Sequence, residues 1–229
     1  MTKSQNGHPP KQRVLVNFIL DRSGSMAAVE DDTIGGFNTY VRELGAEQNV
    51  EYRFTLTLFD TRVEARYVGE PLSKVAPLSR ATYVPGGGTA LYDALGATVR
   101  QVEQTLTHVE KVITVIMTDG HENSSREWTQ EGVQALIAGK EKEGNWTFVF
   151  LGATPDAWDV GMSMGVQQGN RYRYQQGQVQ DVLCSMSRAT NMFSRSSERA
   201  SHSLLRSTGV QSDAIEEEEG SIEAVPKKN

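Results

Sequence analysis

Three oxygen-bearing side chains stand at alternate positions directly after the first apolar segment of the chain. They are Asp21, Ser23 and Ser25, and the largely apolar run before them, residues 14–20, predicts a buried strand. Because alternate residues of extended backbone project to the same side, we expect the carboxylate and both hydroxyls to converge at the end of that strand. Oxygen donors without His or Cys suit a hard cation such as Mg²⁺.

Two further segments favour a cation site over the alternative, a turn in which Asp21 and the serines only cap the following helix. Thr89 lies between the glycines at 86–88 and a helical pattern, and Asp119 follows a second apolar run, residues 111–118. Two predicted strands thus each place an aspartate at the carboxyl end, where open α/β sheets bind their ligands. A parallel sheet would bring these groups together if the two strands are neighbours.

Together these residues resemble the metal-ion-dependent adhesion site of von Willebrand factor type A domains. That site combines an Asp-x-Ser-x-Ser motif, a loop threonine and a later Thr-Asp-Gly, and the sequence carries each piece in order. The resemblance covers roughly residues 11–175, and the stretch 87–95 is similar to the bacterial intracellular branch, including tellurite-resistance-type proteins. It implies a divalent cation held by five residues: Asp21, Ser23, Ser25, Thr89 and Asp119.

The resemblance implies Mg²⁺ as the cation, with Mn²⁺ or Ca²⁺ as alternatives, and an Asp or Glu of a protein partner as its outside ligand. Neutral hydroxyls among the ligands leave the charge of the ion incompletely neutralised, which favours such a carboxylate. For His121 the alternative is a solvent-facing loop position without a role, and for Trp128 it is core packing. The rim that contacts the partner is expected to comprise Gly88, His121, Glu122, Asn123 and Trp128.

The order of the predicted elements indicates an α/β fold. Residues 52–59 and 62–68 read as a hairpin that supplies an antiparallel edge strand. The later strands alternate with helices, as in a parallel sheet covered on both faces. With the resemblance, this predicts a three-layer, Rossmann-like fold with a mostly parallel sheet of about six strands, one of them an antiparallel edge strand. Helices are expected at 29–44, 91–106, 127–142, 155–164 and 178–205, and later strands at 111–118, 146–151 and 171–174.

The length of 229 residues allows one sizeable domain with a tail. We expect a disordered N-terminus over 1–11, the von Willebrand-type domain over 12–175, a C-terminal helix packed on it over 176–208, and an acidic disordered tail over 209–229. Most of the net charge of -6 comes from that tail, which includes four successive glutamates. No basic patch is visible elsewhere, which argues against nucleic acid as a partner.

The cysteine content and the hydropathy pattern predict a cytoplasmic protein. The single cysteine, Cys184, cannot form an internal disulfide and lies in a predicted helix, where we expect a buried and unreactive thiol. The N-terminal segment carries no signal-peptide pattern, and no apolar run reaches the length of a membrane span. No membrane partner is therefore expected.

Three functions remain to be weighed. The leading hypothesis is a non-enzymatic interaction module, an intracellular adaptor in a stress or regulatory complex whose cation binds an acidic residue of a partner. The second is a Mg²⁺-dependent hydrolase or phosphatase of the haloacid-dehalogenase kind, but position 23 is Ser rather than Asp and no lysine accompanies Asp119. The third is a scaffold whose metal is only structural and whose final helix or acidic tail binds the partner. The sequence leaves the oligomeric state open.

Overall fold

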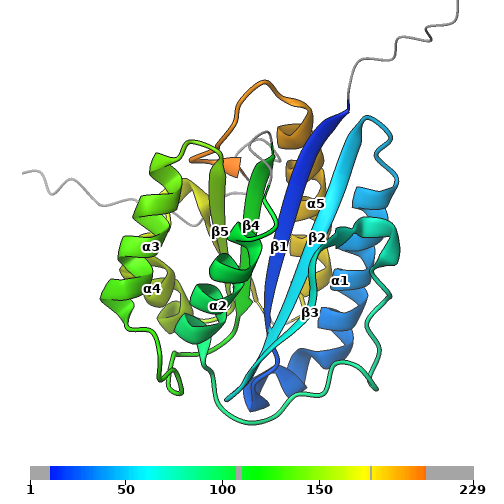
Figure 1. The fold of residues 1–229 in the computed structure, drawn as a ribbon. Coiled ribbons are helices and arrows are strands. Elements are labelled where there is room, and N and C mark those ends of the chain that lie inside the picture. The colour runs from blue at the N-terminus through cyan, green and yellow to red at the C-terminus, as the bar shows by residue number, and fades with distance from the viewer. Residues whose placement is uncertain (1–10, 107–109, 176, 205–229) are drawn as a thin grey trace, which may run out of the picture.

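A six-stranded sheet with helices on both faces forms the centre of the protein (Figure 1). This computed structural model describes residues 11–106, 110–175 and 177–204. The N-terminal segment expected to be disordered, apart from Lys11, and the acidic tail lie outside the described residues. No helix in the described ranges has both the length and the apolar character needed to cross a membrane. The elements are β1 (Gln12–Asp21), α1 (Glu30–Gly45), β2 (Val50–Phe59), β3 (Val63–Pro71), α2 (Leu91–Glu103), β4 (Lys111–Thr118), α3 (Gln130–Lys142), β5 (Trp146–Gly152), α4 (Pro155–Ser163), β6 (Arg171–Arg173) and α5 (Val179–Arg195).

The strand order β3-β2-β1-β4-β5-β6 makes β1 and β4 neighbours at the middle of the sheet. All pairings are parallel except that of β2 with β3, which form the predicted hairpin. The prediction of a mostly parallel sheet with one antiparallel edge strand and helices on both faces is confirmed. The register pairs Leu20 with Met117, so that Asp21 comes level with Thr118 and the two strands end side by side.

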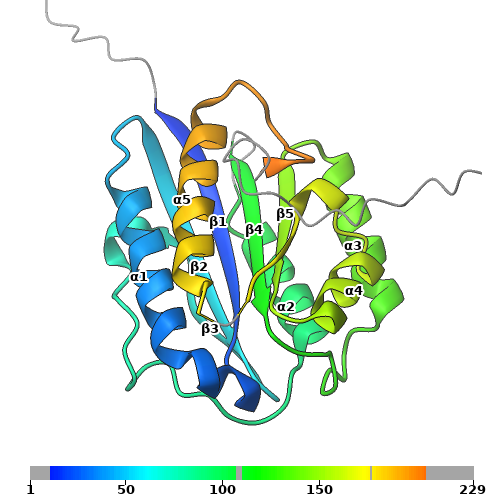
Figure 2. The same cartoon turned by 180° about the vertical axis from the view of Figure 1, so that it is seen from behind.

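Each face of the sheet packs against its own set of helices. Helices α1 and α5 cover one face, as the view from behind shows (Figure 2), and α2, α3 and α4 lie on the other. Side chains of β1 alternate between the two layers, with Phe18 and Leu20 on the α1–α5 side and Leu15 and Ile19 on the opposite side, all fully buried. Because both faces are covered, the central strands are apolar along almost their whole length.

Helix α5 ends at Arg195, well before the predicted end at residue 205. The ammonium of Lys111, at the start of β4, donates hydrogen bonds to the main-chain carbonyls of Phe193 at 2.8 Å and of Ser196 at 2.7 Å. A cation is favourable at a helix C-terminus, where carbonyls lack partners within the helix. The chain then crosses the amino end of the sheet, where the N–H of Ser201 donates to the hydroxyl of Thr147 at 2.9 Å. No local pattern indicates this stop, because the cation comes from a remote strand.

Cys184 is half-buried on α5, facing Glu43 of α1. Its sulfur lies 3.7 Å from Glu43 Oε1, and burial together with that carboxylate raises the pKa of the thiol. A raised pKa disfavours the reactive thiolate form. This environment agrees with the expectation of an unreactive cysteine, but the expectation that the thiol is buried was wrong, because Cys184 is only half-buried.

Candidate metal centre

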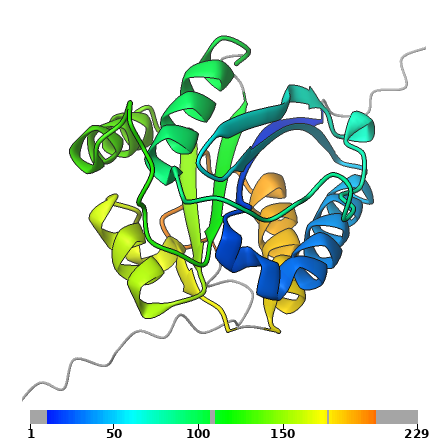
Figure 3. The same ribbon diagram turned by 90° about the horizontal axis from the view of Figure 1, so that it is seen from below.

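The carboxyl ends of β1 and β4 bring the predicted cation-binding side chains together. Asp21 ends β1, Asp119 follows β4 directly, and Thr89 lies on the loop before α2, a loop that crosses the ends of the strands in the view from below (Figure 3). The hydroxyl of Ser25 donates to Asp119 Oδ1 at 2.6 Å, and Ser23 Oγ lies 3.2 Å from Ser25 Oγ. The first contact joins residues that are 94 positions apart in the sequence.

Thr89 faces the same space as Ser25. A Cβ atom added to Gly120 would lie 3.7 Å from Thr89 Oγ1 and 3.8 Å from Ser25 Oγ, so both hydroxyls flank this glycine. Thr89 is buried, whereas Ser25 is exposed. The structure thus places all five predicted ligand residues at one end of the sheet, and their coordination of a cation stays a prediction.

Asp21 is the buried member of the set, and both of its carboxylate oxygens are already hydrogen-bonded. Oδ1 accepts the N–H of Ser23 at 2.6 Å, and Oδ2 accepts the hydroxyl of Thr118 at 2.6 Å. The main-chain carbonyl of Asp21 accepts the hydroxyl of the buried Tyr83 at 2.6 Å. Sequence reasoning did not single out Thr118 or Tyr83 as site residues; for Thr118 the one available signal is its place before Asp119.

The two carboxylates share the site without a compensating cation from the described residues. Arg22, next to Asp21 in sequence, pairs with Asp60 and Glu64 instead. Burial raises the pKa of Asp21 to about 6 and the charge of Asp119 adds to the rise, while hydrogen bonds from Thr118 and Ser23 oppose it. Burial also raises the pKa of Asp119. The ionised forms are therefore disfavoured unless a bound cation offsets their charge.

The donor set fits a hard divalent cation. Every candidate ligand offers oxygen, which is the preference of Mg²⁺ and its relatives. In the part of the chain that the structure describes, no three His, Cys, Asp or Glu side chains gather in a way that could hold a metal ion. Hydroxyls would therefore have to supply part of the coordination. Since both oxygens of Asp21 are already hydrogen-bonded, this residue suits an indirect role beside Ser23, Ser25, Thr89 and Asp119.

Asn123 holds Thr89 from both sides. The N–H of Thr89 donates to Asn123 Oδ1 at 2.9 Å, and the carbonyl of Thr89 accepts the N–H groups of Asn123 at 3.0 Å and Ser124 at 3.1 Å. Gly88 approaches so closely that an added Cβ would lie 2.7 Å from Asn123 Oδ1. Two residues predicted for the partner rim, Gly88 and Asn123, thus touch each other and support a candidate ligand.

The other side of the Thr89 loop is fixed to the end of β1 and to the β2–β3 turn. The N–H of Gly86 donates to the carbonyl of Arg22 at 2.8 Å, and the N–H of Gly88 donates to Thr61 Oγ1 at 2.8 Å. Gly87 has a φ of +74°, and a Cβ there would lie 2.8 Å from Thr61 Oγ1, so this position requires glycine. The loop is therefore held by three different parts of the chain.

Glu122 supports the start of α2, which lacks a side-chain cap of its own. Its Oε2 accepts the N–H of Tyr92 at 3.0 Å, and its Oε1 accepts the N–H groups of Ser124 and Ser125. Asp93 in turn accepts three main-chain N–H groups of residues 126–128. The first-turn donors of α2 and the loop after Asp119 thus satisfy each other's hydrogen bonds.

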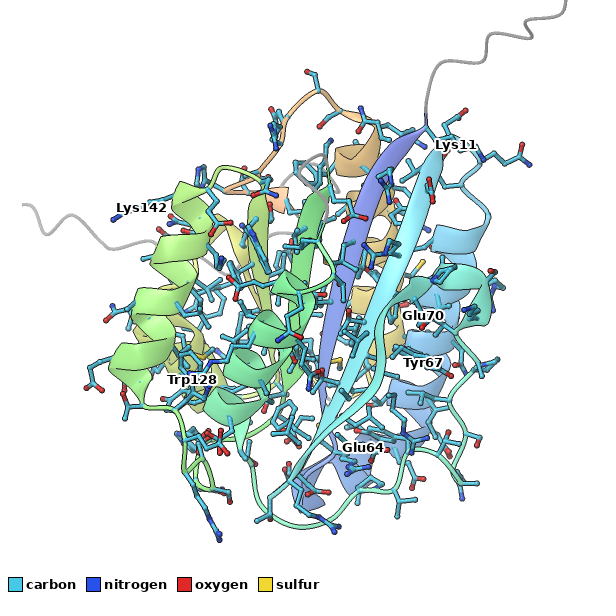
Figure 4. All side chains as sticks on the ribbon, viewed as in Figure 1. Lys11, Glu64, Tyr67, Glu70, Trp128 and Lys142 are labelled. Atoms are coloured by element: carbon cyan, nitrogen blue, oxygen red, sulfur yellow. The ribbon has the colours of Figure 1, made fainter. Side chains whose placement is uncertain are left out.

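Trp128 packs on helix α2. An added Cβ at Gly96 would overlap its ring, and the guanidinium of Arg100 lies 4.5 Å from the ring centroid. Figure 4 shows Trp128 on the α2–α3 side of this end of the molecule and Glu64 on the β3 side. The remaining rim residue, His121, lies on the exposed surface. The packing of Trp128 favours the core alternative, and the partner rim as a whole stays a prediction.

Comparisons with solved structures identify the fold. The chain is similar to the vWF domain of the type V pili tip protein Mfa5 from Porphyromonas gingivalis, with a TM-score of 0.62 and 12% identity over 83% of this chain and 99% of that one. It is also similar to the manganese-loaded TRAP protein of Plasmodium vivax, with a TM-score of 0.55 and 19% identity over 75% and 72% of the two chains.

A third similar structure is proximal thread matrix protein 1 from the mussel byssus with a zinc-occupied MIDAS motif, at a TM-score of 0.57 and 13% identity. The alignment covers 76% of this chain but only 46% of the mussel chain, so the likeness spans less than half of that protein. No protein-family model and no curated protein matches the sequence. At these identities the likeness is one of fold, and the chain has the von Willebrand factor type A fold.

Proposed function

We propose that this chain is a metal-dependent protein-interaction module whose divalent cation, Mg²⁺ foremost, is held by Asp21, Ser23, Ser25, Thr89 and Asp119. The observation that carries the proposal is the hydrogen bond between Ser25 and Asp119, because it joins the motif after β1 to the acid after β4. Similar structures with zinc or manganese support a divalent cation in general. When bound, the cation would supply a Lewis acid for an Asp or Glu carboxylate of the partner.

The protein's own residues have separate tasks in this proposal. Asp119 supplies charge at the surface, while Asp21 supplies charge from below and orients Ser23 through the hydrogen bond to its N–H. Asn123 holds the Thr89 loop in place. Ligand oxygens that are already held in position need little reorganisation when the cation binds, which favours affinity.

We also propose a role without turnover. A phosphatase would need a proton donor two positions after its nucleophile and a cation for the phosphate. Position 23 is Ser, and among the described residues neither Asp21 nor Asp119 forms a salt bridge with Lys or Arg. We therefore propose a cytoplasmic adaptor rather than an enzyme, with the domain over 12–175 as the binding unit and the acidic tail as dispensable.

Two measurements test this function. Isothermal titration with Mn²⁺ and Mg²⁺ should detect one site in the wild type and none in Asp119→Ala, while Glu51→Ala, an exposed acid at the opposite end of the sheet, should bind normally. A pull-down from the native host's lysate should then retain a partner with wild type in Mg²⁺ but not in EDTA or with Asp119→Ala. Removal of residues 211–229 should leave that capture intact.

The opposite results are equally informative. A wild-type protein that binds neither ion would overturn the metal centre. A partner retained in EDTA and by Asp119→Ala, but lost with residues 211–229, would assign the interaction to the tail and the scaffold role to the domain.

A further inference from the structure

A groove of about 650 Å³ lies beside the metal centre, between the β2–β3 turn and the Thr89 loop. We call it the turn groove; it is lined by Arg22, Asp60, Thr61, Arg62, Val63, Glu64, Val84, Pro85, Gly86 and Gly87. Its size is within the range of sites that hold small ligands or a few side chains. The proposed function assigns it no role.

The turn groove and the metal centre share a wall. Gly86 and Gly87 line the groove, and they belong to the same short loop as Thr89. The N–H of Gly24, inside the Asp-x-Ser-x-Ser motif, donates to the carbonyl of Gly87 at 3.1 Å. A chain segment bound at the metal centre would therefore reach the turn groove by crossing this glycine-rich loop.

The charges that line the turn groove balance, two arginines against two acids, and both acids already have internal partners. Arg22 donates to Asp60 Oδ2 at 3.0 Å and to Glu64 Oε2 at 2.7 Å, and the other oxygen of Glu64 lies 2.6 Å from Arg66 Nε. Asp60 Oδ1 accepts the N–H of Arg62. Both carboxylates are thus engaged, and Arg66, which pairs with Glu64, lies outside the groove lining.

Arg62 is the arginine that remains available. Its side chain is 86% exposed, and its Nε is 4.0 Å from Asp60 Oδ1, which is too long for a hydrogen bond. The Arg62–Asp60 pair is therefore a loose one, and a carboxylate of a partner can bind this guanidinium without displacing a side-chain hydrogen bond.

The turn groove has an apolar edge as well. Val84 is 61% exposed, one of the few large apolar side chains on the described surface. Tyr83 before it is buried and donates its hydroxyl to the carbonyl of Asp21, which fixes the backbone from which Val84 projects. Pro85 and Val63 add apolar lining. A partner side chain that covers Val84 would remove apolar surface from water.

We propose that the turn groove binds an extended acidic segment of a partner protein whose first carboxylate occupies the metal centre. An apolar side chain of that segment covers Val84 and Pro85, and a second carboxylate binds Arg62. The inference rests on the proposed function and specifies its partner as an acid–apolar–acid sequence rather than a lone Asp or Glu.

A random heptapeptide library displayed on phage tests this specificity without assuming a spacing. The full chain is immobilised in Mg²⁺, and bound phage are eluted with EDTA. We expect wild type to enrich peptides in which an apolar residue has one acid on each side. Arg62→Gln should enrich peptides with a single acid. Arg126→Gln, an exposed arginine on the loop after Asp119, serves as the matched control and should enrich the wild-type sequences.

The best enriched peptide, resynthesised with a fluorophore, then gives affinities. Replacement of its second acid by the amide should weaken binding by about threefold to fivefold, as expected for an exposed ion pair. The same replacement should have no effect on binding to Arg62→Gln, because the pair is already lost. Val84→Ser should weaken binding of the same peptide. The affinity for Mn²⁺ should stay unchanged in Arg62→Gln and in Val84→Ser.

The outcomes separate this inference from the proposed function. Two results would overturn the role of the turn groove and leave the metal centre standing. One is that the EDTA-eluted peptides carry a single acid, and the other is that they bind Arg62→Gln as well as wild type. A library that yields no EDTA-eluted peptide also overturns the inference, while the Mn²⁺ titration decides the metal centre independently. Peptides retained equally by Asp119→Ala would overturn both.

Discussion

Asn123 brackets Thr89: its side-chain oxygen accepts the N–H of Thr89 at 2.9 Å, and its own N–H donates to the carbonyl of Thr89 at 3.0 Å. A pair of bonds of this kind fixes the peptide groups on both sides of the candidate ligand. These bonds join the loop after Asp119 to the loop that carries Thr89, so we expect Asn123 to help set the distance between these two candidate ligands.

Replacement of Asn123 should change metal affinity through this acceptor. Asn123→Leu removes the oxygen and should weaken Mn²⁺ binding by about 10–100-fold, the usual cost of losing a group that orients a ligand. Asn123→Asp keeps both acceptor bonds, to Thr89 N–H and Ser124 Oγ, and should bind at least as well as wild type. Titration calorimetry gives both values, and circular dichroism checks folding. If Mn²⁺ binding is weakened equally in the two variants, the acceptor oxygen of Asn123 does not determine metal affinity.

Two neighbouring glycines give a matched test of the close approach. A Cβ at Gly88 would overlap Ser124 Oγ and lie 2.7 Å from Asn123 Oδ1, whereas nothing lies within 4 Å of a Cβ at Gly86. Gly88→Ala should therefore cost about 1–3 kcal/mol of unfolding free energy and weaken Mn²⁺ binding. Gly86→Ala should stay within about 0.5 kcal/mol of wild type. Denaturant unfolding with and without Mn²⁺ measures both quantities, and a harmless Gly88→Ala would refute the tight packing of the loops.

Saturating metal should stabilise the fold. At a Mg²⁺ concentration one hundred times its Kd, binding to the native state adds about 2.7 kcal/mol, which corresponds to roughly 5–10 °C in Tm for a protein of this size. Asp21→Asn removes one of the two carboxylate charges of the site and should show no such rise, whereas Glu51→Ala should match wild type. Thermal unfolding in Mg²⁺ and in EDTA provides the comparison. An Asp21→Asn protein stabilised as much as wild type would place the cation elsewhere.

Lys111 predicts a pH dependence of stability remote from the metal centre. Burial lowers its pKa from 10.5 to about 8, although the charge of Glu198 opposes the shift. Between these values the unfolded chain binds more protons than the native state, so the free energy of unfolding rises with pH across this window. Lys111→Met should be less stable throughout, because carbonyls of Phe193 and Ser196 lose their donor, and should lack this rise.

Urea unfolding of both proteins in EDTA, from about pH 7 to about pH 9.5, tests the difference in slope. The tyrosines contribute equally to the two proteins and cancel in the comparison. Parallel curves for wild type and Lys111→Met would mean that Lys111 keeps its ordinary pKa, with the carbonyls stabilising the ammonium.

The core elements were predictable because each depends on its own residues. The apolar runs of β1 and β4 and the alternating pattern of the β2–β3 hairpin can be read from the residues of each strand alone. Together they predicted a mostly parallel sheet with an antiparallel edge strand. The helix ends were less predictable. Helix α3 begins at Gln130 rather than Glu127, since Thr129 caps it by accepting the N–H of Gly132 at 3.2 Å, and α5 ends where Lys111 reaches it.

The candidate site divides in the same way. Asp21, Ser23, Ser25, Thr89 and Asp119 could be named because motif spacing identifies them. The supports of Asp21 and Thr89 could not, since Tyr83, Thr118 and Asn123 act through contacts between segments that are distant in sequence. The sequence predicts Asn123 only as a rim residue. Its hydrogen bond to Thr89 depends on the fold, which brings two loops that are 34 positions apart into contact.

The hydrogen bond from Thr118 to Asp21 joins residues 97 positions apart, with the β2–β3 hairpin and α2 between them in the sequence. Contacts of such long range form only after much of the chain has been ordered. We therefore expect the complete set of candidate ligands to assemble late in folding, after β1 and β4 have paired. If the proposed cation binds there, its presence would report that this pairing is complete, and a partner bound through the cation would select folded molecules.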